Sequence, residues 1–120
     1  MSHEEFEPLV KDALSSLPRE FQEALSNVDI VVEDQPSDEQ RRRMHLRPWV
    51  NLFGLYEGVP KTQRRNYSMV LPDKITIFKN AIVDSFGDDE AIKEQVRRTV
   101  FHEIGHHLGM DDKKLRKLRY

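Results

Sequence analysis

The chain has 120 residues, of which 38% are hydrophobic and 33% charged, and its net charge at pH 7 is −2. This length suits one domain, so we expect a single domain over residues 1–120. The small net charge gives no general attraction to nucleic acid or to anionic membranes, and we expect neither as a partner. The chain has no cysteine, which excludes disulfides, thiolate metal sites and cysteine nucleophiles.

Targeting signals are not apparent in the sequence. No apolar run approaches the roughly 18 residues that a membrane-spanning helix needs. The N-terminus has neither the basic start nor the apolar stretch of a signal peptide. We therefore expect a cytoplasmic protein.

The N-terminal segment predicts two helices. Apolar residues recur with helical spacing over residues 6–17, and we expect the regular helix to begin near Glu7, with Pro8 in its first turn. Pro18 ends this helix, because proline disfavours a helical conformation in the residue before it. A second short helix is then expected over residues 19–25.

A strand and a short helix follow. Residues 28–33 form a short run rich in β-branched side chains, which is typical of a strand. Pro36 stops that strand. Either Ser37 or Asp38 is suited to cap a short helix that runs through Met44.

The remaining chain predicts turns, a strand and a long helix. Residues 47–60 are expected to combine an extended segment with turns, and residues 61–68 are expected to form a surface loop. Residues 75–78 predict a second strand. A helix is predicted over residues 89–108, with Gly109 as its C-terminal cap. The apolar positions that define this helix are Ile92, Val96, Val100 and Ile104.

The end of this helix carries the pattern His-Glu-x-x-His over residues 102–106. Side chains four residues apart lie about 40° from each other around a helix, so His102 and His106 project together toward one metal ion. Glu103 lies about 100° round from His102, which is too far for a natural third ligand. It is suited instead to accept a proton from a water molecule at the metal.

The third ligand must come from beyond the helix. A catalytic zinc ion usually has three protein ligands and one open position. Gly109 allows a sharp turn of the backbone, after which Asp112 can return toward the metal. We therefore predict that His102, His106 and Asp112 bind one Zn²⁺. Iron is the alternative metal, because two histidines and one carboxylate also suit non-haem iron.

The extended pattern is specific. In a shuffled chain of this composition His-Glu-x-x-His arises in roughly 2 of 100 cases. Requiring the later glycine and aspartate as well lowers this to about 6 in 100,000.

Three alternative interpretations of the motif stay open. Glu103 can be an ordinary surface residue beside a structural metal site. Asp111 or another residue can replace Asp112 as the third ligand. His107 lies about 100° from His106 around the helix, so we expect it to pack or to face solvent. The two histidines of the pattern can also be ordinary polar residues of a half-buried helix.

The sequence resembles a small bacterial family of minimal zincin-like metallopeptidases over nearly its whole length. The resemblance implies an α+β fold in which several helices pack on a small sheet. It also implies metal ligands at His102, His106 and Asp112, with Glu103 as the catalytic carboxylate. The segments that carry the resemblance are Leu17-Pro18 with Phe21, Val31-Val32-Glu33-Asp34 with Pro36, residues 54–60, residues 71–78 and the motif at 102–112.

We therefore predict a zinc-dependent metallopeptidase that hydrolyses a peptide or amide bond of a peptide or protein substrate. Glu103 is the predicted general base. The strand over residues 75–78 is expected to be a core strand and, in addition, a surface on which an extended substrate can pair. A second hydrogen-bond donor for the oxyanion is needed, and the candidates are Tyr56, Arg64, Arg65 and Tyr67.

A non-catalytic metal-binding or interaction module with a degenerate zincin fold is the alternative function. Larger zincins of the metzincin type usually have histidine at the last ligand position and a methionine-containing turn beneath the metal. Here only eight residues follow Asp112, and none of them is methionine. We therefore expect no deep, two-walled substrate cleft.

Overall fold

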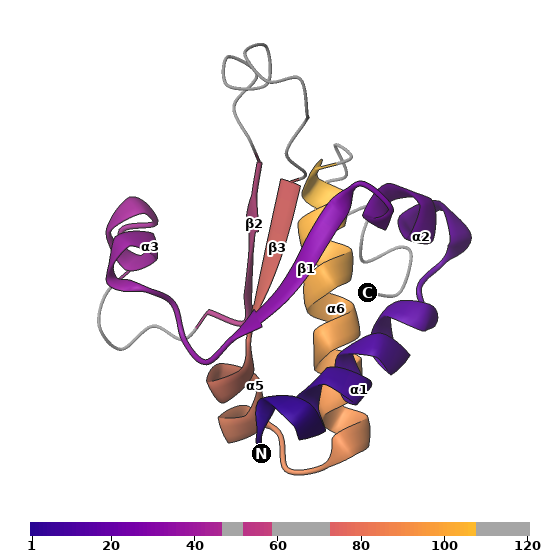
Figure 1. Ribbon diagram of the computed structural model, residues 1–120, viewed down its shortest axis with the longest axis horizontal. Helices are drawn as coiled ribbons and strands as arrows, with labels where there is room; N and C mark the ends of the chain where they lie inside the picture. The colour runs from indigo at the N-terminus through magenta and orange to yellow at the C-terminus, as the bar shows by residue number, and fades with distance from the viewer. Residues whose placement is uncertain (47–51, 59–72, 108–120) are drawn as a thin grey trace.

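The computed structural model describes residues 1–46, 52–58 and 73–107, and it describes the side chains of this set through residue 105 (Figure 1). Within these ranges no helix is both long and apolar enough to cross a bilayer. Helices pack on a small mixed sheet, so the predicted α+β class is confirmed. The elements in chain order are α1 (His3–Ser15), α2 (Arg19–Leu25), β1 (Val28–Glu33), α3 (Asp38–Arg43), β2 (Gly54–Glu57), β3 (Asp73–Phe78), α5 (Lys79–Ser85) and α6 (Asp89–His107).

The sheet has the strand order β1-β3-β2, with β1 parallel and β2 antiparallel to β3. Its central strand β3 therefore has a neighbour along both edges. The prediction that residues 75–78 form a core strand is confirmed. The suggestion that this strand also pairs with a substrate is wrong, because its backbone groups are already used by β1 and β2.

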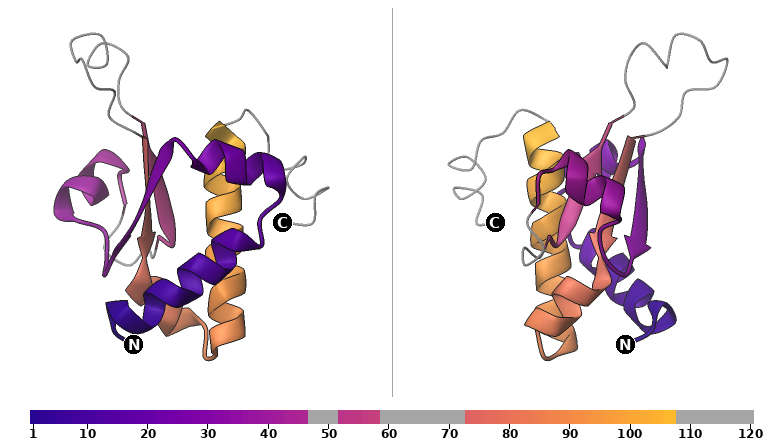
Figure 2. Two further views of the ribbon diagram at one scale, coloured as in Figure 1. Left: turned by 45° about the vertical axis from the view of Figure 1, so that its right-hand side comes forward. Right: turned by 90° about the vertical axis from the view of Figure 1, so that its left-hand side faces the viewer.

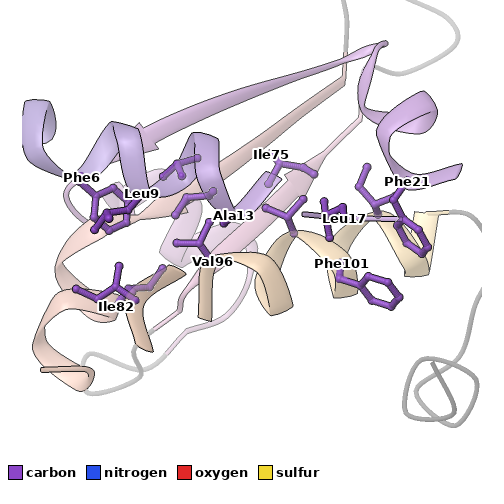
Figure 3. Close-up of a cluster of buried hydrophobic side chains, with 14 residues drawn as sticks. Phe6, Leu9, Ala13, Leu17, Phe21, Ile75, Ile82, Val96 and Phe101 are labelled. Atoms are coloured by element: carbon purple, nitrogen blue, oxygen red, sulfur yellow. The ribbon is translucent and has the colours of Figure 1, made fainter. Parts of the chain in front are cut away.

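Helix α6 runs along one face of the sheet and contacts α1, α2, α5, β2 and β3 (Figure 2). Its C-terminal end lies at the same end of the sheet as the last residues of β2 and the first residues of β3 (Figure 1). Figure 3 shows the apolar cluster that fills the space between α1, α6 and the sheet. Its fully buried members include Phe6, Phe21, Ile75, Ile77, Ile82, Val96, Val100, Phe101 and Ile104.

Helix α1 begins at His3, so the predicted start near Glu7 is wrong. The cause is a reciprocal cap: the Glu5 N–H donates to Ser2 Oγ and the Ser2 N–H donates to Glu5 Oε1, each at 3.1 Å. This cap satisfies two donors of the first turn. Pro8 therefore lies inside the helix, where its missing N–H removes one hydrogen bond without ending the helix.

Helix α5 has no counterpart among the predicted elements. It is seven residues long and lacks a side-chain cap, because Phe78 occupies the N-cap position. It buries only Lys79 and Ile82, which is too few residues for a helical period to stand out. This short helix turns the chain so that α6 returns along the sheet.

The other predicted elements that fall in the described ranges are confirmed, with end shifts of no more than two residues. Ser37 caps α3 through a reciprocal cap with Gln40. Strand β2 is the extended part of the predicted 47–60 segment. The predicted loop over residues 61–68 and the cap at Gly109 lie outside the described residues.

Thr76 offers a test of the packing in β3. It is fully buried, and within the described part of the chain its hydroxyl has no hydrogen-bond partner. Burying such a group costs roughly 1–3 kcal/mol, so we expect Thr76→Val to raise the free energy of unfolding by about 1 kcal/mol, measured by urea denaturation.

The matched control is Thr99→Val on α6. Thr99 is also buried, but its hydroxyl accepts a hydrogen bond of 3.0 Å from Gln95 Nε2. This variant is expected to lose stability. Equal changes in the two variants would show that the unpaired hydroxyl of Thr76 has no energetic cost.

Candidate functional site

Helix α6 is continuous from Asp89 to His107 and carries the whole His-Glu-x-x-His pattern. Its N-terminus is capped by Asp88, whose Oδ1 accepts the Ala91 N–H at 2.8 Å. Near the C-terminal end of the helix, buried residues and half-buried polar residues follow one another closely. Phe101 is fully buried, and the next two residues, His102 and Glu103, are half-buried. The polar residues of the pattern therefore lie at the border of the core.

The described residues include part of the predicted metal site. His102 is described in full, His106 has its backbone in α6, and Asp112 lies outside the described residues. Helical continuity puts the two histidines one turn apart on one helix, as the two-imidazole prediction requires. Among the side chains that are described, no three His, Asp or Glu residues gather as a ligand group. The three-ligand site stays a prediction.

Glu103 contacts the edge of the sheet. Its Oε2 accepts a hydrogen bond of 3.2 Å from the backbone N–H of Tyr56 in β2. The Phe78 N–H donates to Phe53 O at 2.9 Å, and in an antiparallel pair every second residue makes such bonds. The Tyr56 N–H therefore points away from β3, toward the outer edge of the sheet. The carboxylate of the motif thus binds an outward donor of an edge strand.

Gly54 allows β2 to lie against α6. A Cβ atom at this position would overlap the Cγ2 atom of Thr99 on the helix and would lie 3.3 Å from Thr76 O. Only a residue without a side chain permits this close approach. The consequence for the site is that the backbone of β2 comes within hydrogen-bonding distance of Glu103.

The side chain of Tyr56 is also bonded. Its hydroxyl donates to Oδ2 of Asp73 at 2.5 Å, and Asp73 is buried, with 8% of its surface exposed. The Tyr56 hydroxyl, which the sequence suggested as a donor to the oxyanion, is therefore already hydrogen-bonded to a carboxylate. The other candidates, at positions 64, 65 and 67, lie outside the described residues. The sequence did not indicate Asp73 as a site residue, because an aspartate that follows a proline is typical of a turn.

A pocket of about 260 Å³ lies between α3 and β2. In Figure 1, α3 lies beyond the outer edge of β2. The carboxylate of Glu57 joins the two elements, since it accepts hydrogen bonds from Gln40 Nε2 at 3.0 Å and from Arg43 Nη2 at 2.8 Å. The residues that line the pocket are Gln40, Arg43, Met44, Leu55, Tyr56, Glu57 and Gly58.

Comparisons with known proteins identify a family and a similar fold. A family model described as zincin-like metallopeptidase matches residues 25–120, which include the motif at 102–112. Among solved structures, a conserved hypothetical protein from Thermo thermophilus has a similar fold, with a TM-score of 0.57 and 22% sequence identity. The similarity covers 90% of this chain and 94% of that chain. No curated protein matches the sequence.

Proposed function

Because the chain belongs to the family of zincin-like metallopeptidases, we propose that it hydrolyses a peptide or related amide bond with the aid of one bound Zn²⁺. Glu103 is the general base in this proposal. The observation that carries it is the position of Glu103, half-buried on α6 and hydrogen-bonded to the outward N–H of an edge strand. A carboxylate held at the border of core and solvent is suited to proton transfer.

His102, His106 and Asp112 are the residues that would hold the metal. Neutral imidazoles and a carboxylate are ligands that zinc prefers, and a chain without cysteine has no thiolates to offer. The continuous helix supports a shared ion for the two histidines, since it keeps them one turn apart. When bound, zinc would polarise the scissile carbonyl and increase the acidity of the attacking water.

Glu103 would perform the proton transfers. Its carboxylate accepts a proton from the attacking water and then delivers it to the nitrogen of the leaving amine. General acid–base catalysis requires the carboxylate to stay within hydrogen-bonding reach of both groups. The bond from the Tyr56 N–H restricts the rotation of the Glu103 side chain and supports this requirement.

The outer edge of β2 is the surface that we propose for the substrate. Within the described residues β2 pairs with β3 alone, so an extended peptide can add to its other edge through the backbone groups that Glu103 does not use. This edge lies beside Glu103. The pocket between α3 and β2 would receive a substrate side chain that points away from α6.

Glu103→Gln tests the function directly. We expect this variant to hydrolyse a mixture of fluorogenic peptides at least about 100-fold more slowly than the wild type, because it lacks the general base. Zinc content, measured by elemental analysis, should be unchanged. The matched control is Glu94→Gln on the same helix, where the carboxylate pairs with Arg97 and Arg98. The control should keep wild-type activity.

Two results would contradict the proposal. If the wild type and Glu103→Gln hydrolyse the peptides at the same background rate with equal zinc content, the protein is a non-catalytic metal-binding module. If protein purified without added metal contains iron in stoichiometric amount, the zinc assignment is wrong.

A further inference from the structure

We propose that Tyr56 and Asp73 are positioning residues for Glu103, an inference that rests on the proposed function. Tyr56 makes one hydrogen bond with its backbone and another with its side chain. Its backbone N–H donates to Glu103 Oε2 at 3.2 Å and its hydroxyl donates to Asp73 Oδ2 at 2.5 Å. One residue of an edge strand thus joins the carboxylate of the motif to a second, buried carboxylate.

Asp73 is the fixed end of this chain of contacts. It is the first residue of β3, the central strand, and only 8% of its surface is exposed. A buried carboxylate must have hydrogen-bond donors, so losing one is costly. The O···O distance of 2.5 Å is in the range of a charge-assisted bond from a hydroxyl to a carboxylate. Asp73 is thereby a strong anchor for the Tyr56 side chain.

Tyr56 needs such an anchor because of its position in the sheet. Strand β2 is four residues long and lies at the edge of the sheet. The residues on either side of Tyr56 form the backbone hydrogen bonds to β3, while the Tyr56 backbone groups point away from β3. In the register of the sheet Tyr56 lies opposite Ile75, two residues after Asp73. Side chains of such diagonal neighbours lie on one face, within reach of each other. The phenol therefore fixes β2 at the point where its N–H meets Glu103.

The geometry separates this role from simple packing. The ring of Tyr56 packs against the apolar core, and phenylalanine would preserve that contact. The hydroxyl, by contrast, contacts Asp73. Removing the hydroxyl alone therefore tests positioning while leaving the packing in place.

Tyr56→Phe and Asp73→Ala are the test variants. We expect each to lower kcat by about tenfold, with KM within twofold of the wild type and zinc content unchanged. Because both remove the same bond, the double variant should lose no more activity than either single variant. Thr76→Val, which removes a buried hydroxyl from the neighbouring strand, is the control and should keep wild-type kcat.

Hydrogen exchange of the residue 56 amide gives a readout that is independent of activity. This amide points away from β3 and donates to Glu103, so Glu103→Ala should increase its exchange rate by about tenfold. Tyr56→Phe and Asp73→Ala should increase it similarly, while the amides of β3 keep their protection. If Asp73→Ala unfolds, Asp73→Asn is the substitute. It preserves the shape of the side chain and is expected to give a smaller effect in the same direction.

The outcomes separate the two proposals. If Glu103→Gln is inactive while Tyr56→Phe keeps wild-type kcat, or keeps wild-type protection of the residue 56 amide, the positioning role alone is overturned. If Glu103→Gln is as active as the wild type, the proposed function fails. The exchange data would then show only that the contacts exist, and the inference would fall with the function on which it rests.

Discussion

Gly54→Ala is expected to lower the free energy of unfolding by about 2 kcal/mol, the usual cost of overfilling a packed interface. The new methyl group would overlap Thr99 Cγ2 and force β2 away from α6. In a strand without such a contact, alanine is favoured over glycine by roughly 0.5–1 kcal/mol. A decrease in the free energy of unfolding would therefore identify the clash. Chemical denaturation measures the loss. The rate of peptide hydrolysis should also fall, because displacing β2 moves the Tyr56 N–H away from Glu103.

A second substitution in Gly54→Ala should restore much of the loss. Thr99→Ser removes the methyl group that clashes and keeps the hydroxyl that accepts from Gln95. The double variant Gly54→Ala/Thr99→Ser should therefore be more stable than Gly54→Ala alone, although Thr99→Ser by itself is neutral or slightly destabilising. Strictly additive free energies for the two changes would mean that this contact does not limit the distance between strand and helix.

Zinc is expected to stabilise the folded protein by about 2.7 kcal/mol when its free concentration is about 100 times the dissociation constant. The reason is that a metal that binds only the folded chain shifts the unfolding equilibrium. The measurement is the thermal midpoint with zinc and with a chelator. His102→Ala and His106→Ala should abolish the difference between the two midpoints.

His3→Ala is the control for the zinc experiment. His3 lies in the first turn of α1, near the N-terminus and at the opposite end of the molecule from the C-terminal end of α6 (Figure 1). This variant should keep the full response to zinc. Comparing Asp112→Asn with Asp111→Asn then identifies the third ligand. A wild-type response in His106→Ala would contradict the proposed ligand set.

The fold was predictable where local patterns are strong. Helix α6 has an apolar residue at every fourth position and an aspartate before its first turn, and both signals are visible in the sequence. The start of α1 was also encoded, in the Ser2 and Glu5 pair. Pro8 led the prediction to a later start, because proline is favoured in the first turn of a helix. Helix α5 has neither a cap nor a period, and nothing local predicts it.

The candidate site was predictable only along the helix. The spacing of His102, Glu103 and His106 is a local property, and one continuous helix is enough to bring them together. The contact between Tyr56 and Glu103 joins residues 47 positions apart, and the contact between Tyr56 and Asp73 joins residues 17 positions apart. Both depend on the strand order, which no local pattern encodes. The need for glycine at position 54 likewise follows only from the packing of β2 on α6.

The late position of α6 in the chain has a consequence for biosynthesis. This helix contacts α1, α2, α5, β2 and β3, yet it is the last described element to leave the ribosome. At about 5–20 residues per second, the residues from the end of β3 to the end of α6 take about 1.5–6 seconds to synthesise, and the apolar surfaces that α6 covers stay exposed for that time. The interior is therefore completed only when the segment with the histidines has been synthesised.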